Sequence, residues 1–469
     1  MTNRRLCLVG LFSLLLVAAG IAQPAIDAPA LYATHCAQCH GANLEGGTGS
    51  SLIDGVWDYG AKRHFKARNI KYGILSAGMP AWQHALDDDQ VEALLVFILD
   101  RESTAAPVPP PLPTHVSTED YELEVTPVVP GMGNPWAIEF IDARRALVTE
   151  VTGQLRWLID DQLDPTPITG LPAVNTHVQG GLLDLVIDPD YAANGWIYIC
   201  YTDFDTDDNV MIAIARGRVR DHRWIDEQSL FKAPADQYTG MNHNQGARVL
   251  IDEDGYLYFS IGDRGVSANG QLPSQAAAKV HRIHRDGTIP ADNPFVGDPA
   301  ALPSLYTMGN RNAQGLARHP ATGELWETEH GPMGGDELNR LSPGANYGWP
   351  RVTLGVDYDG TSLSEHTSLP GLTDPIHHWT PSIAVCGIDF HDGTNFPAWR
   401  HNLFVTSLKF HQLRRLVVDE HGQVTHEEIM LKNIGRARDV DIAPDGSIYV
   451  LTNNPGRILK LSRSSGDDR

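Results

Sequence analysis

The sequence predicts an all-β six-bladed β-propeller preceded by a small all-α domain. Three observations lead to this prediction: a turn-and-strand pattern that recurs six times between residues 145 and 449, a Cys-x-x-Cys-His motif near the N-terminus, and a proline-rich segment between the two. A chain of 469 residues has room for two or three domains, and its 42% hydrophobic content supplies their cores.

The net charge limits the kinds of partner that the protein can have. A formal charge of -22 predicts a strongly acidic surface, and no basic patch interrupts it. We therefore expect no nucleic-acid partner, and cationic or neutral partners fit better.

The first 22 residues are typical of a secretory signal peptide. Arg4 and Arg5 precede an apolar run from Leu6 to Ala19, and Gly20-Ile21-Ala22 forms a small-residue cleavage site. The apolar run is too short for a membrane span and no second run follows, so we expect cleavage after Ala22, a periplasmic protein and no membrane span in the mature chain. An uncleaved anchor is the alternative.

Residues 25–103 are predicted to form a cytochrome c domain. In Cys36-Ala37-Gln38-Cys39-His40, the thiols of Cys36 and Cys39 are placed to bond haem c covalently and His40 to reach the iron. Met79, between Gly78 and Pro80, is the candidate for the sixth iron ligand, with core packing as its alternative role. A bis-histidine haem that uses His64 or His84 is the other possibility.

One helix of this domain is visible in the sequence. Asp87, Asp88 and Asp89 place negative charge where a helix begins, and the apolar residues that follow lie on one helical face: Val91, Leu94, Leu95, Ile98 and Leu99. Residues 104–116 then form a linker, because the run from Ala105 to Thr114 holds five prolines and predicts a semi-rigid extended spacer.

Residues 117–465 contain the repeated pattern. Each of six segments joins a turn to an aromatic or aliphatic strand, and several follow an apolar strand that ends in an acidic residue or proline; the six are 145–148, 194–198, 254–258, 322–326, 400–404 and 445–449. Irregular repeats of this size fit four-stranded blades, with a β-sandwich as the fallback. Cys200 and Cys386 lie in strand-like runs, and we favour buried free thiols over a disulfide.

The stretch from Gly309 to Pro350 has the richest chemistry. Arg311 places a fixed positive charge beside the amide of Asn312, and Gly309 and Gly315 allow close approach of a ligand to the backbone. A turn at residues 329–332 and the acidic residues of 334–337 offer oxygen atoms of the kind that calcium prefers.

At these residues the chain resembles the soluble PQQ-dependent sugar dehydrogenases, including the aldose sugar dehydrogenases. The motifs GNRNAQGLA, EHGP, GGDELN and NYGWP occur in that family's order, and the resemblance runs from Pro127 to Ser462. It departs at Met333 and in the loop from Val266 to Ala278, where we expect substrate choice to be set.

The resemblance implies a set of catalytic residues. His243 matches the family's catalytic base, and Asp263, in Gly262-Asp263-Arg264-Gly265, is placed to hold its imidazole in the proton-accepting tautomer unless it is an ordinary turn aspartate. Arg311 is expected to stabilise charge that develops on the quinone oxygen.

The resemblance also implies cofactor and metal ligands. Gln179 and Asn312 are expected to orient PQQ or substrate, and Lys409, Arg436 and Arg438 to bind the PQQ carboxylates. The carbonyl oxygens of Gly331 and Pro332 are the expected ligands of a calcium ion at PQQ. A second, structural calcium is expected near Glu337 and the Tyr347 backbone.

The sequence thus predicts an exported quinohaemoprotein that oxidises an aldose to its lactone and passes electrons to its own haem and then to an external cytochrome or quinone acceptor. Three alternatives remain open: a dehydrogenase of non-sugar alcohols, a calcium-dependent lactonase on the same scaffold, and a non-enzymatic binding propeller. The haem motif argues against the lactonase, since hydrolysis releases no electrons.

Overall fold

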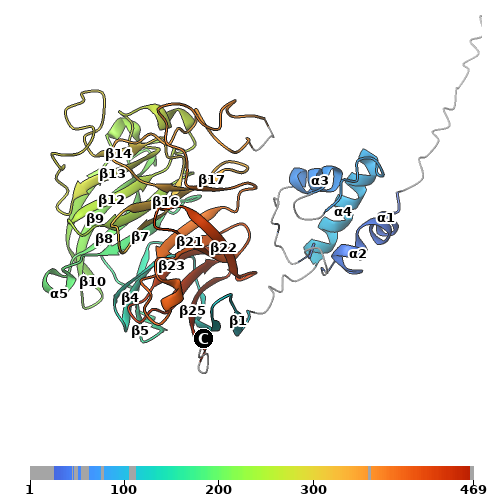
Figure 1. Ribbon diagram of the computed structural model, residues 1–469, viewed down its shortest axis with the longest axis horizontal. Coiled ribbons are helices and arrows are strands. Elements are labelled where there is room, and N and C mark those ends of the chain that lie inside the picture. Colours follow the sequence, from blue (N-terminus) through green and yellow to red (C-terminus); the bar gives the residue numbers. More distant parts are fainter. Residues whose placement is uncertain are drawn as a thin grey trace, which may run out of the picture. The chain divides into compact units, whose positions relative to one another are not determined.

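The computed structural model describes residues 26–44, 46, 51–53, 57, 63–74, 79–104, 112–357 and 361–464. The chain divides into two compact units, Met1–Pro109 and Pro110–Arg469 (Figure 1). The expected signal peptide and most of the proline-rich segment lie outside the described residues. No helix in the described ranges is both long and apolar enough to cross a membrane.

The described helices of the N-terminal unit pack around one small apolar core. They are α1 (Ala28–His35), α2 (Ala37–His40), α3 (Arg63–Tyr72) and α4 (Asp88–Thr104). Helix α4 begins with a reciprocal cap in which Gln90 N–H donates to Asp87 Oδ1 at 2.8 Å and Asp87 N–H donates to Gln90 Oε1 at 3.0 Å. Its buried face consists of Val91, Leu94, Leu95 and Ile98, which confirms the predicted helix and its orientation.

The C-terminal unit is a six-bladed β-propeller, as the sequence predicts. Among its described residues, five four-stranded antiparallel sheets and one five-stranded sheet form the blades. The first three blades contain β3 (Pro135–Asp142), β4 (Arg145–Glu150), β5 (Gln154–Ile159), β6 (Gln162–Leu163); β7 (Leu182–Ile187), β8 (Ile197–Phe204), β9 (Val210–Arg220), β10 (Arg223–Lys232); and β11 (Gly246–Ile251), β12 (Tyr256–Ile261), β13 (Lys279–His284), β14 (Leu305–Met308).

The remaining blades follow the same plan. They contain β15 (Ala313–Arg318), β16 (Leu325–Glu329), β17 (Asp336–Arg340), β18 (His377–Trp379); β19 (Val385–Phe390), β20 (Leu403–Ser407), β21 (Gln412–Val418), β22 (Val424–Leu431); and β23 (Arg436–Ile442), β24 (Ile448–Asn453), β25 (Gly456–Arg463), β2 (Glu122–Met132), β1 (His115–Ser117). Short helical segments lie in the connections: α5 (Tyr191–Asn194), η2 (Ala235–Gln237), η3 (Ser267–Gln271) and η4 (Pro397–Trp399).

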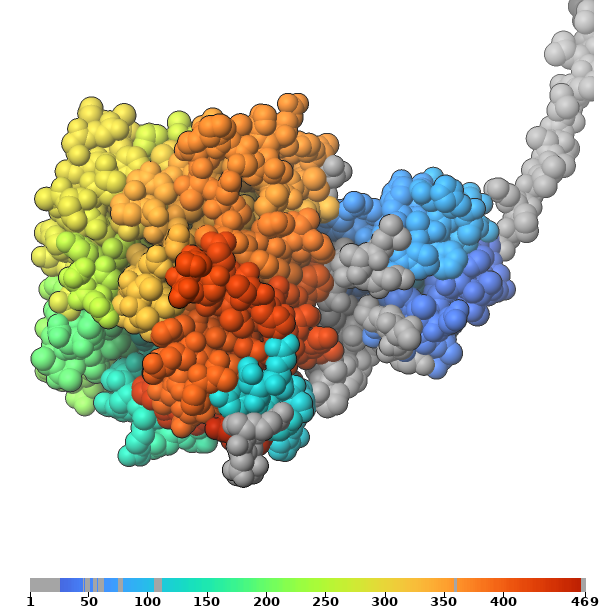
Figure 2. All heavy atoms as spheres, viewed as in Figure 1, coloured from blue at the N-terminus to red at the C-terminus, as the bar shows by residue number. Residues whose placement is uncertain are grey.

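The ring closes by pairing the two ends of this unit. Strand β2 lies antiparallel to β25, so residues from the start and the end of the propeller share the last blade (Figure 1). Figure 2 shows the N-terminal residues of the unit, in cyan, packed against orange and red C-terminal residues. Tyr121 packs edge-on against Trp399, whose indole N–H donates to Asp120 at 2.9 Å. This closure leaves the ring without an open seam.

Each recurring sequence pattern corresponds to the hairpin between the first and second strands of a blade. The second strands β4, β8, β12, β16, β20 and β24 are buried over most of their length. A strand covered on both faces favours a continuous aromatic or aliphatic run, which explains why these segments stand out in the sequence. The first strands of the six blades adjoin one another in a ring around the central channel.

Candidate active site

The predicted propeller residues gather at one end of the central channel. Four of them immediately precede the innermost strands β7, β11 and β15: Gln179, His243, Arg311 and Asn312. Arg436 and Arg438 are the first and third residues of β23. Asp263, the turn from 329 to 332 and Lys409 follow the second strands β12, β16 and β20, which run antiparallel to the innermost strands. Ends of both kinds therefore meet at the same mouth.

His243 lies in an exposed loop whose backbone is held on both sides. The Asn244 backbone N–H donates to Gln179 Oε1 at 2.9 Å, and Asn244 Nδ2 donates to Asp263 Oδ1 at 2.8 Å. Gly262 passes so close to this loop that a Cβ atom there would lie 2.1 Å from the Asn244 carbonyl oxygen, so glycine is required.

Asp263 has different partners from the one expected. Its Oδ1 accepts from Asn244 and from the Gly265 backbone at 2.8 Å, and its Oδ2 accepts from the Trp349 indole at 3.0 Å. Within the described residues no hydrogen bond joins it to the His243 imidazole. The carboxylate instead fixes the residue after His243, because the loop turns the Asn244 side chain and not the imidazole toward Asp263.

Arg311 and Asn312 are anchored by a buried carboxylate. The backbone N–H groups of both residues donate to Glu329 Oε2. The Arg311 guanidinium donates to the carbonyl oxygens of His330 at 2.9 Å and Gly331 at 3.0 Å and lies over the Trp349 ring, 5.1 Å from its centroid. Arg311 is only 8% exposed, so its positive charge lies in a position that is largely shielded from water.

Three arginines concentrate positive charge around His330. Burial and the nearby charges of Arg311, Arg438 and Arg436 lower the pKa of His330 to about 3, so this imidazole is neutral. Burial and the Arg438 charge also lower the pKa of Arg436. Like charges held this close favour an anionic ligand.

The other expected cofactor ligands lie around this cluster. Arg438 donates to Gln314 Oε1 at 2.9 Å and Asn453 Oδ1 at 3.0 Å, and Arg436 donates to the Leu408 carbonyl oxygen at 3.5 Å. Lys409 follows Leu408, with its ammonium 5.5 Å from the Phe410 ring centroid. The arrangement places cationic side chains from the fourth, fifth and sixth blades near one another.

A buried acidic cluster lies next to Arg311. Asn339 Nδ2 donates to Glu327 at 3.1 Å, to Glu329 at 3.2 Å and to Glu337 at 3.5 Å. Burial raises the pKa of Glu337 to about 7 and that of Glu327 to about 8, and Glu327 Oε1 has no hydrogen-bond partner in the described chain. A cavity of about 10 Å³ lined by Glu329, Glu337 and Tyr347 adjoins this cluster.

These oxygens agree with the chemistry that calcium requires, although side chains alone do not complete a site. Among the described residues, no group of three or more His, Cys, Asp and Glu side chains is arranged to hold a metal ion. Carbonyl and amide oxygens would therefore have to contribute. Gly331 is fixed by the bond from its N–H to Asp336 at 3.0 Å, and a Cβ there would lie 2.1 Å from the Gly334 oxygen.

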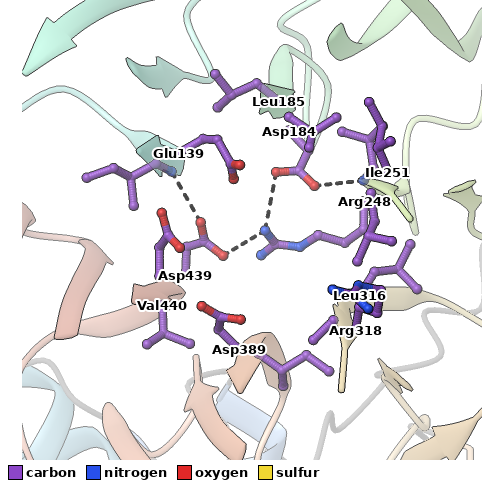
Figure 3. Close-up of a pocket in the computed structure, with 17 residues that line it drawn as sticks. Glu139, Asp184, Leu185, Arg248, Ile251, Leu316, Arg318, Asp389, Asp439 and Val440 are labelled. Atoms are coloured by element: carbon purple, nitrogen blue, oxygen red, sulfur yellow. Dashed lines mark hydrogen bonds and ion pairs between the residues drawn. The ribbon is translucent and has the colours of Figure 1, made fainter. Parts of the chain in front are cut away.

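A cavity larger than the one beside Glu337 lies deeper in the channel, and none of the predicted site residues lines it. It measures about 240 Å³ and is lined by residues of all six innermost strands. Figure 3 shows Glu139, Asp184, Asp389 and Asp439 around Arg248, which donates to Asp439 at 2.7 Å and to Asp184 at 3.5 Å. Asp441 also lines this cavity.

Arg248 connects this cavity to the mouth. Its guanidinium donates to the carbonyl oxygens of Gln314 at 2.6 Å and Arg438 at 3.1 Å. The Cys386 sulfur lies 3.3 Å from Arg438 and 3.9 Å from Arg248. The cavity is thus the floor beneath the cationic cluster and a part of the scaffold. Cys386 and Cys200 are both buried and free.

The haem motif lies at the junction of α1 and α2. Cys36 and Met79 pack against the same apolar cluster, which includes Tyr32 and Leu94, and Cys39 is exposed. Burial raises the pKa of Cys36 to about 11. Ile74 and Met79 exchange backbone hydrogen bonds at 2.9 and 3.0 Å, which fixes the position of Met79.

The alternative iron ligands are placed differently. His64 and His84 are exposed, and neither belongs to the apolar cluster that includes Met79. A haem bound through Cys36 would lie against this cluster, because Cys36 itself packs there. The residues present therefore fit a haem with His40 and Met79 as ligands better than a bis-histidine haem.

Comparison with known proteins identifies both units. The family model described as glucose/sorbosone dehydrogenase matches residues 132–460. The chain belongs to this family. A second model, subunit III of cbb3-type cytochrome c oxidase, matches residues 24–98. The protein is therefore a glucose/sorbosone dehydrogenase family oxidoreductase fused to an N-terminal cytochrome c domain, and the predicted resemblance is confirmed.

Individual relatives of this family support the assignment. The chain is 36% identical over 340 residues to the aldose sugar dehydrogenase YliI of Escherichia coli, covering 71% of this chain and 90% of that protein. It is 25% identical over 434 residues to quinoprotein glucose dehydrogenase B of Acinetobacter calcoaceticus, covering 76% and 90%. The crystal structure of a glucose dehydrogenase at 35% identity superposes with a TM-score of 0.70, covering 72% of this chain and 99% of that one.

The site residues fit an anionic polar cofactor of the kind that such quinoproteins use. Arg311 Nε and His330 Nε2 are buried without hydrogen-bond partners in the described residues. A buried donor left unpaired is costly, so a ligand that accepts from these atoms would be favoured. The repulsion between Arg436 and Arg438 points to the same conclusion.

Sequence reasoning missed several residues that shape this mouth. Glu329 and His330 belong to the EHGP turn motif, yet their burial and their bonds to Arg311 and Asn312 follow only from the fold. Trp349, which bonds Asp263 and covers Arg311, lies in the NYGWP motif, and that motif was the available signal. Gln314 bridges Asn312 and Arg438, and nothing in the sequence alone indicates it.

Proposed function

We propose that this protein is an exported quinohaemoprotein that oxidises an aldose at its anomeric hydroxyl to the lactone. The observation that carries the proposal is the cluster of Arg311, Arg436 and Arg438 around neutral His330, beside exposed His243. This cluster matches a cofactor with several carboxylates, and His243 is within a loop that substrate can reach.

PQQ, when bound, would supply a two-electron acceptor for the hydride that leaves the anomeric carbon. Arg436, Arg438 and Lys409 would hold the cofactor's carboxylates, while Gln179 and Asn312 would orient it and the substrate by hydrogen bonds. Arg311 would direct its charge toward the position where negative charge develops.

His243 accepts the proton of the anomeric hydroxyl through its imidazole nitrogen. Loss of that proton and of the hydride converts the hemiacetal carbon into the lactone carbonyl. The sugar thus loses two protons and two electrons in all, one proton to His243 and the rest as hydride. Asp263 contributes by fixing Asn244, and therefore the loop, rather than by bonding the imidazole.

We further propose that calcium ions complete the site. One would bind at the carbonyl oxygens of Gly331 and Pro332, and a structural ion would bind near Glu337 and the Tyr347 backbone. Support for the structural ion comes from the unpaired Glu327 oxygen and from the three glutamates that accept from Asn339, and carbonyl or amide oxygens would have to complete its coordination. The Gly331 carbonyl oxygen accepts from Arg311 at 3.0 Å, so the ion at PQQ would have to use its other lone pair.

The haem unit gives the electrons an exit. Cys36 and Cys39 would hold haem c, with His40 and Met79 as iron ligands, and an external cytochrome or quinone would take the electrons onward. A tethered acceptor is present at high effective concentration, which explains why both units occur in one chain. Periplasmic export is part of the proposal and rests on the expected signal peptide at residues 1–22 together with the haem motif.

The decisive experiment is anaerobic visible spectroscopy of the haem-loaded protein. PQQ and Ca²⁺ are added first, and then a panel of aldoses. Haem reduction that requires PQQ, Ca²⁺ and an aldose would support the cofactors, the reaction and the internal electron path together. Failure of PQQ to bind, with the haem remaining oxidised under all conditions, would contradict the proposal and favour a binding propeller.

Oxidation of non-sugar alcohols is the second candidate, and one observation favours it. Val178, Met241 and Val266 are 56%, 44% and 43% exposed and lie in the loops around His243. Exposed apolar side chains near a base suit substrates with apolar groups. Aliphatic and aromatic alcohols therefore belong in the substrate panel, and a higher kcat/KM for them than for any aldose would replace the aldose assignment.

A further inference from the structure

Arg264 stands out as a buried charge that forms no direct ion pair among the described residues. The residue is 1% exposed, and burial lowers the pKa of its guanidinium to about 10, although the charge of the neighbouring Asp263 opposes this change. Its Nε atom lacks a hydrogen-bond partner in the described chain. Burying a guanidinium costs free energy of folding unless its hydrogen bonds compensate for the lost contact with water.

The hydrogen bonds that Arg264 does make are directed at a single loop. Its Nη1 donates to the carbonyl oxygen of His243 at 3.2 Å, and its Nη2 donates to that of Met241 at 2.9 Å. Both acceptors belong to the backbone of the segment that carries the imidazole. The preceding residue, Asp263, holds Asn244 from the other side at 2.8 Å.

The backbone of this region is held in a left-handed conformation at two facing positions. Asn244 has φ 48° and Arg264 has φ 59°. Non-glycine residues in this region cost about 1 kcal/mol or more each and persist where surrounding contacts enforce them. Here those contacts are the bonds between residues 263–264 and 241–244. They hold the backbone both before and after the His243 imidazole.

We propose that Arg264 is a positioning residue for His243. Its guanidinium fixes the two carbonyl groups around His243, while the imidazole stays exposed toward the mouth of the channel. The catalytic part of this inference rests on the proposed function, in which His243 is the base. Displacement of a catalytic base by about 1 Å can lower the rate on the order of 100-fold, so a backbone that holds His243 in place would raise kcat.

The test compares Arg264→Met with a matched buried arginine outside the mouth. Arg415 in β21 is 3% exposed and bonds Asn402, Glu428 and Glu119, so Arg415→Met controls for the loss of a buried guanidinium. In the PQQ-loaded protein with a soluble dye acceptor, Arg264→Met should lower kcat by about 10- to 100-fold with KM changed less than about threefold. Arg264→Lys, which retains one donor centre, should recover part of kcat, and Arg415→Met should retain kcat.

A second readout does not depend on turnover. In the cofactor-free protein, hydrogen exchange of the amides of residues 241–245 should be at least about tenfold faster in Arg264→Met than in the unsubstituted protein and in Arg415→Met. Diethyl pyrocarbonate should also modify the imidazole of His243 at a changed rate in Arg264→Met, with His243→Ala as the background.

The outcomes separate this inference from the proposed function. Unchanged loop exchange in Arg264→Met overturns the positioning role, whether or not the protein oxidises aldoses. Equal losses of kcat in Arg264→Met and Arg415→Met also overturn it, because they would reflect general destabilisation. If the unsubstituted protein oxidises no substrate while loop exchange responds as expected, the proposed function fails and the restraint of the loop by Arg264 is supported.

Discussion

Replacing Arg248 by methionine tests how the floor of the channel is held together. Arg248, Asp184 and Asp439 are 4%, 6% and 5% exposed, and the guanidinium makes bonds of 2.7 Å to Asp439 and 2.6 Å to the Gln314 carbonyl oxygen. Removing one partner of a buried ion pair costs about 3–5 kcal/mol, because the remaining charges stay buried without compensation. We expect a loss of this size at pH 7.

The loss should grow as the pH rises. Burial already raises the pKa of Asp184 to about 7 even though Arg248 opposes the change. Without Arg248 this pKa rises further. A carboxylate whose pKa is higher in the folded state binds more protons there than in the unfolded chain, so its contribution to stability falls as the pH increases from about 4 through the folded pKa. Arg248→Met should therefore be closest to the unsubstituted protein near pH 5.

Thermal unfolding of the full chain at pH 5, 7 and 8 measures this effect. A loss of about 3–5 kcal/mol corresponds to a decrease of roughly 4–7 °C in the Tm of a propeller transition of this size. Arg248→Lys, which keeps a positive charge but cannot bridge two carboxylates and two carbonyl groups, should lose less. A loss that is independent of pH, or a Tm at pH 8 equal to that of the unsubstituted protein, would refute the reasoning.

Three further predictions concern the channel, the base and the haem. Burial raises the pKa of Asp389 to about 7, so the stability of the unsubstituted protein should fall between pH 5 and pH 8 as this carboxyl ionises. Asp389→Asn should flatten that fall and raise the free energy of unfolding by up to about 4 kcal/mol at pH 8. An unchanged pH profile in denaturant titrations would contradict this. His243→Ala should retain PQQ binding, measured by titration of the cofactor-free protein, and lose kcat by about 100-fold or more; normal turnover would remove His243 as the base. Met79→Leu should lower the haem potential and leave sugar oxidation with a soluble dye intact, and an unchanged potential in a redox titration would assign the sixth ligand elsewhere.

The blades were predictable because each contributes the same local signal. The turn and the apolar run at 194–198 or 445–449 report a hairpin whose second strand is buried on both faces. The closure of the ring is a different matter. Strand β2 pairs with β25 across more than 300 residues, and no local pattern in either strand specifies that partner.

The candidate site divides in the same way. His243 and Arg311 lie in motifs that can be recognised in the sequence, and the fold brings both to one mouth. The role of Asp263 could not be derived, because the choice between the imidazole and Asn244 as its partner depends on which way the loop turns. The role of Gln314 could not be predicted from the sequence either, since its bonds to Asn312 and Arg438 join the fourth and sixth blades across the channel.

The channel contains two layers of ionisable side chains, and their order matters for cofactor binding. Arg311, Arg436 and Arg438 form the cationic layer at the mouth, and the carboxyl groups of the central cavity form the layer below. Arg248 joins them, since it bonds Asp439 below and the Arg438 carbonyl oxygen above. Burial raises the pKa of Asp184 and that of Asp389 to about 7, so the lower layer carries only part of its full negative charge at neutral pH and leaves much of the repulsion between the arginines for an anionic ligand to relieve. An anionic cofactor would then meet cations that are already fixed in place, so little of its binding energy would be needed to order the site.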